Sequence, residues 1–135
     1  MSVLSILVVG LGSGLGAMVR YSVSLAGLTY LDTVWPWATL GVNGLGAWLI
    51  GGYARLTQAH RHQTVASLLM RQWFMVGFCG GFTTFSLFSL ETLMLFEQQA
   101  WGLAGLYIGV SLWVWLFAVW LGYYSAQYYC RTYHS

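Results

Sequence analysis

The sequence predicts an all-α membrane protein: a single domain over residues 1–135 with four transmembrane helices. Three observations support this prediction. Only 6% of the 135 residues are charged and 59% are hydrophobic, whereas a soluble domain carries about 25% charged residues. The mean hydropathy is +0.68. Eight Trp and nine Tyr also fit a membrane protein, because their amphipathic rings favour the headgroup region.

Four apolar segments are long enough to cross a bilayer, since a span needs about 20 mostly apolar residues. They are residues 3–28, 35–53, 65–96 and 101–129. No basic residue precedes the first apolar run, so we expect a span there and not a cleavable signal peptide. Pro36 suits the first turn of the second helix. Cys79 and Cys130 are expected to be free thiols.

The first span contains closely spaced glycines and one arginine. Glycines at positions 10, 12, 14 and 16 form small-xxx-small pairs on two faces, which predicts close helix packing. Their spacing does not match the dinucleotide fingerprint, which argues against nucleotide binding. Arg20 is ionisable within a span, which suggests a functional site. An arginine can also snorkel toward the interface, and both interpretations stay open.

The second and fourth spans carry isolated polar residues. Asn43 lies in the second span, where a buried amide needs hydrogen-bond partners. Bonding between helices is its expected role, although its NH₂ group also offers two donors to an anion. Tyr107 and Ser111 lie four residues apart in the fourth span, on one face. They either line a polar path or are an interfacial tyrosine and a serine bonded to its own helix.

The third segment is too long for a plain span and is rich in small and hydroxyl residues. These are Gly77, Gly80, Gly81, Thr83, Thr84, Ser86 and Ser89. Glycine permits non-helical backbone, and freed carbonyls within a membrane need partners in protein, water or ions. Because broken helices at membrane depth often form ion sites, we expect a broken helix around residues 80–83. The alternative is a tilted, continuous helix with small residues for packing.

The few charges predict the orientation of the chain. With four spans, one side collects the loop and tail arginines and the other side collects two acids. The residues are Arg55, Arg61, Arg71 and Arg131 against Asp32 and Glu97. The positive-inside rule therefore predicts that both termini are cytoplasmic.

Composition and motifs also exclude several functions. A net charge of +2 is too small for nucleic-acid binding. The absence of metalloprotease, P-loop and CxxC motifs, and of paired carboxylates, argues against an enzyme. The buried polar groups are mostly donors, whereas a cation path would be expected to show acidic rings or many carbonyls. This pattern favours a small anion as the ligand.

Residues 77–91, GFCGGFTTFSLFSLE, closely resemble the signature of the fluoride-specific ion channels of the Fluc/CrcB family. Residues 16–21, GAMVRY, and 39–43, TLGVN, followed by Gly51, agree with the same family. The resemblance extends over the whole chain in length and helix count. It implies a passive fluoride channel in a bacterial inner membrane that lowers cytoplasmic fluoride and its toxicity.

The resemblance also implies roles for individual residues. Phe85 and Phe88 would present their ring edges to fluoride, because the edge of an aromatic ring is positive. Asn43 would donate to fluoride near the vestibule, with Arg20 as a nearby cation. Further pore-lining residues would be Thr84, Ser86, Tyr107 and Ser111. The backbone carbonyls of Gly80 and Thr83 would hold a structural Na⁺ ion that is not transported.

Members of this family work as antiparallel dimers, so the resemblance implies a homodimer embedded in lipid. A heterodimer with an oppositely oriented paralogue is the alternative, because the arginine bias favours one orientation. Leu87 stands where the family usually has threonine, so we expect slower conduction.

Two other functions compete with the channel. One is a small dual-topology multidrug or cation exporter, which would need a carboxylate where this chain has Arg20. The other is a non-transporting membrane assembly subunit.

Overall fold

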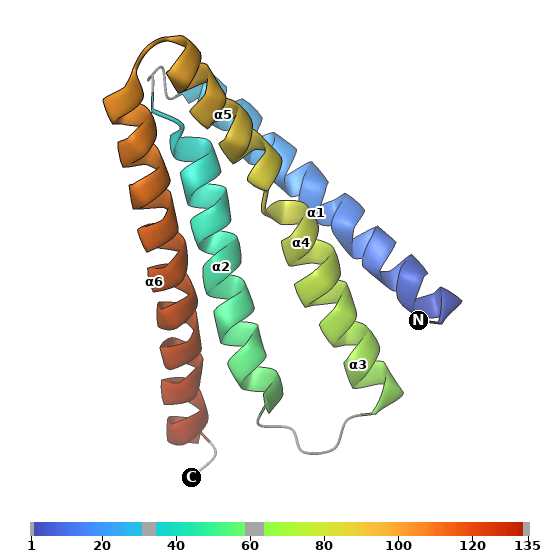
Figure 1. Ribbon diagram of the computed structural model, residues 1–135. Helices are drawn as coiled ribbons and strands as arrows, with labels where there is room; N and C mark the ends of the chain where they lie inside the picture. Colours follow the sequence, from blue (N-terminus) through green and yellow to red (C-terminus); the bar gives the residue numbers. More distant parts are fainter. Residues whose placement is uncertain (1, 31–34, 59–63, 134–135) are drawn as a thin grey trace.

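A computed structural model describes residues 2–30, 35–58 and 64–133, and these residues form helices and short connections without strands. Asp32 and Arg61, which entered the charge count, lie outside the described residues. The elements are α1 (Val3–Tyr30), α2 (Trp37–Gln58), α3 (Val65–Arg71), the π-helical η1 (Gln72–Cys79), α4 (Gly80–Phe82), α5 (Phe85–Glu97) and α6 (Trp101–Tyr133) (Figure 1). The predicted all-α class is therefore confirmed.

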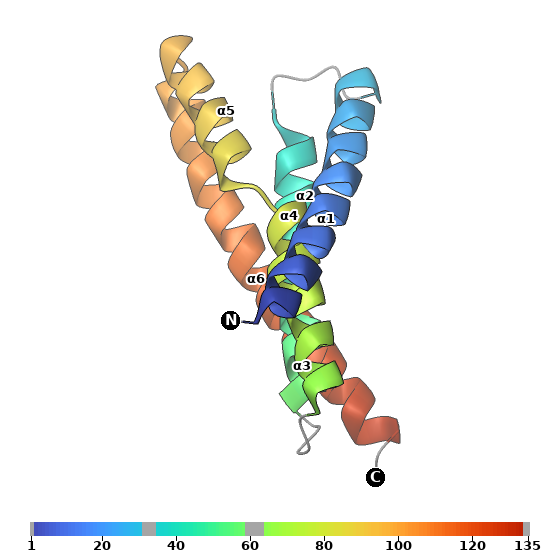
Figure 2. The same cartoon turned by 90° about the vertical axis from the view of Figure 1, so that its right-hand side faces the viewer.

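The helices associate in two groups. The main partner of α2 is α6, and the two helices lie side by side (Figure 1). The main partners of α1 are η1 and α4. Beyond α4, α5 leans away from α1 and packs on α6 (Figure 2). The third segment therefore connects the two groups, and its residues 83–84 mark the point of divergence.

Glycines bring the backbone of α1 close to η1. A Cβ atom on Gly16 would collide with the carbonyl oxygen of Phe78. One on Gly12 would meet the backbone of η1 in the same way. By contrast, nothing lies within 4 Å of a Cβ atom built on Gly10 or Gly14. The expected close packing through glycine is therefore confirmed for one face of α1 only.

Three helical stretches of the described chain are long and apolar enough to cross a membrane. They are Val3–Gly27, Val65–Glu97 and Trp101–Thr132. The 22-residue α2 is not among them, because Asn43 and several glycines lower its hydropathy. Large apolar side chains cover the outside of the molecule: Leu11 is 69% exposed and Trp113 is 76% exposed. Such a surface suits lipid.

The third segment departs from α-helical geometry at two places along its length. It passes from α-helix to π-helix at Gln72 and back at Gly80. The backbone then becomes extended at Thr83 and Thr84, whose ψ values are 158° and 124°. Gly80 keeps helical angles (φ −64°, ψ −37°). A break was expected around residues 80–83. The extended residues are Thr83, the last of that range, and Thr84, the residue after it.

The two ends of α5 are fixed by local hydrogen bonds. At its start, the Thr84 hydroxyl accepts a hydrogen bond of 3.2 Å from the Leu87 amide. At its end, Gln99 adopts a positive φ of 59°, and the Ala100 amide donates to the Leu95 carbonyl at 2.9 Å. This pattern is a Schellman motif. It turns the chain sharply, so α6 returns alongside α5.

Candidate functional site

Asn43 joins α2 to the extended residues through two hydrogen bonds. Its Nδ2 donates to the Thr84 carbonyl at 2.8 Å, and its Oδ1 accepts from the Thr84 amide at 2.7 Å. Both residues are buried, with 7% and 8% of their surface exposed. The amide therefore replaces the backbone partners that Thr84 would have in a helix. One of its two N–H groups remains for a ligand.

Arg20 supports the same region from α1. Its Nε donates to the Gly81 carbonyl at 3.2 Å, and the side chain is half-buried. Of the two interpretations of Arg20, snorkelling alone does not fit, because the guanidinium is bonded to α4. Arg20 does not line the pocket beside Asn43.

The interruption changes the hydrogen bonding of two carbonyls. In a continuous helix the Gly80 carbonyl would accept from the Thr84 amide, and the Thr83 carbonyl from the Leu87 amide. Here the first amide donates to Asn43 and the second to the Thr84 hydroxyl. Both carbonyl oxygens therefore lose their usual helical donors and are open to another ligand.

The two phenylalanines of the signature differ in exposure. The ring of Phe85 is 73% exposed, whereas that of Phe88 is 7% exposed. Their centroids lie 5.7 Å apart and their planes make an angle of 45°. Phe85 projects from the first turn of α5 and lines a pocket of about 280 Å³ together with Asn43, Thr83 and Thr84. The structure thus brings these four predicted residues together.

Glu91 accepts two hydroxyl hydrogen bonds between helices. The Thr39 hydroxyl of α2 donates to Oε1 at 2.6 Å, and the Tyr107 hydroxyl of α6 donates to Oε2 at 2.7 Å. Neither Glu91 nor Thr39 is among the site residues predicted from the sequence. The partners are 52 and 16 residues from Glu91 in the chain, so local spacing gave no sign of the contact. A single carboxylate within a span is unusual, and this feature could have identified Glu91 as a candidate site residue.

Tyr107 and Ser111 are fully buried, each with 0% of its surface exposed. The ring of Tyr107 is therefore enclosed by protein. The Ser111 hydroxyl adjoins Tyr107 but makes no hydrogen bond of normal geometry within the described residues. It is consequently not bonded to its own helix. Ser86 is exposed and its hydroxyl lies 3.2 Å from that of Thr84.

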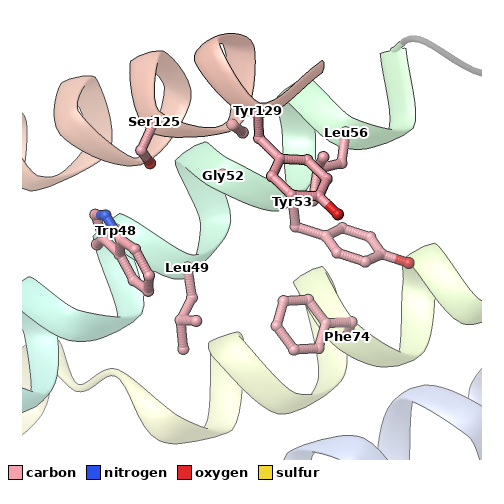
Figure 3. A pocket seen from close by; sticks show the side chains of 9 residues that line it. Trp48, Leu49, Gly52, Tyr53, Leu56, Phe74, Ser125 and Tyr129 are labelled. Carbon is pink, nitrogen blue, oxygen red and sulfur yellow. The ribbon is translucent and has the colours of Figure 1, made fainter. Parts of the chain in front are cut away.

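A second pocket, of about 350 Å³, lies between α2, η1 and α6 (Figure 3). Aromatic and apolar side chains dominate its lining, including Trp48, Tyr53, Phe74 and Tyr129. None of the predicted site residues lines it. We therefore place the candidate site at the interruption and not in this pocket.

Three helical stretches of the described chain that are long and apolar enough to cross a membrane indicate a multi-pass membrane protein. Residues 7–123 match the family described as "CrcB-like protein, Camphor Resistance (CrcB)". The chain belongs to this family, whose members are ion channels and not enzymes. The family resemblance of residues 77–91 is thereby confirmed.

Relatives match over most of the chain. A protein of Rhodopseudomonas palustris (strain BisB18), named fluoride-specific ion channel FluC 1, is 46% identical over 112 residues, covering 83% of this chain and 79% of the relative. The fluoride-specific ion channel FluC of Paramagnetospirillum magneticum is 45% identical, covering 87% and 91%. That of Gluconobacter oxydans is 41% identical, covering 94% and 88%.

Proposed function

We propose that this chain is a subunit of a passive, fluoride-selective channel that lets fluoride leave the cytoplasm and so reduces its toxicity. The observation that carries the proposal is the pair of hydrogen bonds between Asn43 and Thr84. This pair holds an extended backbone within an apolar span and projects Phe85 outward beside an amide donor. Further support comes from the relatives, which match over more than four fifths of the chain and are named fluoride-specific ion channels.

Fluoride conduction requires that the lost hydration shell be replaced by fixed donors. In this chain such donors are the free N–H of Asn43 and the hydroxyls of Ser86 and Ser111. The positive ring edges of Phe85 and Phe88 add a weaker attraction that would not trap the ion. Several weak sites in series allow an ion both to enter and to leave. The chain needs no chemical step for this task.

The Gly80 and Thr83 carbonyls fit a structural Na⁺ ion. Both are neutral oxygen ligands without their usual helical donors, and unwound backbone carbonyls are known sodium ligands. The ion would supply a fixed positive charge that neutralises these dipoles within the membrane. Two carbonyls leave most of its ligand sphere to other groups, which suits an ion shared between two copies of the chain.

The working channel is an antiparallel dimer in which each chain has four spans, with α2 as the second and the interrupted segment as the third. One feature supports a partner: the ring of Phe85 is 73% exposed. The homodimer is the default, with an oppositely oriented paralogue as the alternative. We place the dimer in the bacterial inner membrane, with cytoplasmic termini unless the chain inserts in both orientations.

Efflux from liposomes tests this function. Vesicles containing the purified chain are loaded with fluoride, and release is followed with a fluoride electrode in Na⁺ or in N-methylglucamine. Fast release that requires Na⁺ is the expected result. Protein-free vesicles are the control for leakage.

The same vesicles separate the competing functions. Uptake of organic cations driven by a proton gradient, without fluoride release, would indicate the exporter. The absence of both activities in a folded protein would indicate the assembly subunit. Arg20, which occupies the place of the exporter's carboxylate, argues against the exporter.

A further inference from the structure

A tryptophan continues the stripe of polar side chains on α6. Tyr107, Ser111 and Trp115 are spaced four residues apart and therefore lie on the same side of the helix. Phe88 packs against both ends of this stripe: its ring centroid lies 5.2 Å from that of Tyr107 and 5.0 Å from that of Trp115. Its ring thus covers Ser111, which is 0% exposed.

Two donors of this stripe are buried without a partner in the described part of the chain. They are the indole Nε1 of Trp115 and the hydroxyl of Ser111. The third donor, the Tyr107 hydroxyl, is bonded to Glu91. Burying an unpaired donor costs free energy, so such groups usually serve a ligand, water or function. Two of them four residues apart indicate a shared ligand.

The position of Trp115 connects this stripe to the pocket at the interruption. Trp115 lines the pocket of about 280 Å³ together with Asn43, Thr84 and Phe85. Trp115 thus shares a pocket with Asn43 and lies one helical turn from Ser111 on α6. An anion moving from one to the other would pass the edge of the indole ring.

We propose that the Trp115 indole N–H donates a hydrogen bond to the conducted anion and helps determine which anions pass. This inference rests on the proposed fluoride conduction and adds a specificity-determining residue to it. An indole N–H only donates, so it offers nothing to a cation. Held by the Phe88 ring, it cannot rotate as a hydroxyl does, and it favours a small, strong acceptor such as fluoride over chloride.

Replacing Trp115 by phenylalanine tests the inference, because it keeps an aromatic ring and removes the donor. We expect fluoride efflux from liposomes to fall by about tenfold or more, as for the loss of one hydrogen bond to a charged group. The fluoride-to-chloride ratio should fall as well. Trp113→Phe is the matched control, since Trp113 lies on the same helix and is 76% exposed; its efflux should be unchanged.

A measurement on the unchanged protein makes the test independent of the variant's folding. The indole ¹H–¹⁵N resonance with NOE contacts to the Phe88 ring should shift on titration with NaF and not with NaCl. Two results would overturn the inference. One is an indole resonance that does not respond to NaF although the unchanged protein releases fluoride. The other is a wild-type rate of efflux from a folded Trp115→Phe protein. Lack of any wild-type efflux would instead contradict the proposed function.

Discussion

At the scale of single residues, Asn43 contributes most to the site. A side-chain amide offers both a donor and an acceptor, so it can satisfy both backbone groups of one extended residue. Thr84 requires this because its backbone is buried and does not continue the helix. The same amide keeps one N–H for an anion. Structural and functional roles therefore coincide in a single side chain.

Replacing Asn43 by alanine should destabilise the protein and abolish fluoride efflux. The amide and carbonyl of Thr84 would remain buried without partners, at a cost of about 1–3 kcal/mol for each group. The free energy of unfolding in detergent micelles measures this loss. Thr57→Ala is the control, since within the described ranges the Thr57 hydroxyl bonds to carbonyls of its own helix. A wild-type free energy for Asn43→Ala would contradict the role of the amide.

The sequence predicted part of this residue-scale picture. The polar residues of the signature were predicted because they are unusual within an apolar span. The contacts of Glu91 were not, because Thr39 and Tyr107 reach it only after α2 and α6 have packed against α5. The bond from Arg20 to Gly81 spans 61 residues and was hidden for the same reason.

At the scale of elements, the interrupted third segment connects the two helix groups. Its extended residues lie where the Thr84 hydroxyl caps α5 and the Asn43 amide replaces the missing backbone partners. The glycines that first suggested an interruption remain helical. Two of them have a steric role, because Gly77 and Gly81 let the backbone of α1 approach closely, whereas nothing lies within 4 Å of a Cβ atom built on Gly80. Composition therefore predicted an irregular segment, and tertiary contacts fixed its position.

The packing of α1 on the third segment predicts opposite effects for two neighbouring glycines. Gly16→Ala should lower stability by about 1–3 kcal/mol, because its Cβ would collide with the backbone of Phe78. Gly14→Ala should be neutral or stabilising, since nothing lies within 4 Å of that position and alanine favours helix. Thermal unfolding of both variants in the same detergent measures the difference. Equal melting temperatures would contradict the described packing.

The first turn of α5 carries Leu87 where the family usually has threonine, and the side chain is half-buried. Leu87→Thr should increase the rate of fluoride efflux, because it adds a hydroxyl donor beside Ser86. Selectivity against chloride should be retained. Leu93→Thr, at a 52% exposed position of the same helix, is the control. An unchanged rate for Leu87→Thr would show that this position does not contribute to conduction.

At the scale of the whole molecule, hydrophobic length predicted the helical class and the approximate ends of the helices. The expected segment of residues 101–129 extends to Tyr133, and that of residues 35–53 extends to Gln58. Three stretches of the described chain are apolar enough to cross a membrane, and α2 is not one of them. Its hydropathy is lower because it contains Asn43 and glycines, which allow close packing on α6 and on the interruption. The proposed dimer would place a partner subunit beside the ring of Phe85, which is 73% exposed.

Orientation in the membrane provides a test at this scale. Arg55 and Arg131 lie in the last turns of α2 and α6, and the C-terminal ends of these two helices point the same way (Figure 1). The arginine bias alone would make a C-terminal alkaline phosphatase fusion inactive and a C-terminal green fluorescent protein fusion bright, whereas the proposed antiparallel homodimer predicts that both fusions are active. Activity of both fusions would show insertion in two orientations and favour the homodimer. A single active fusion would favour an oppositely oriented paralogue.

The central claim is selective, passive conduction of fluoride through the site at the interruption. Vesicles loaded with equal fluoride and chloride, and containing the wild-type chain, test it most directly when both anions are followed together. With K⁺ as the internal cation and valinomycin added to carry the compensating charge, we predict rapid and nearly complete release of fluoride, with chloride retained and no energy source supplied. Release of both anions at similar rates, or retention of both by a folded protein, would contradict the claim.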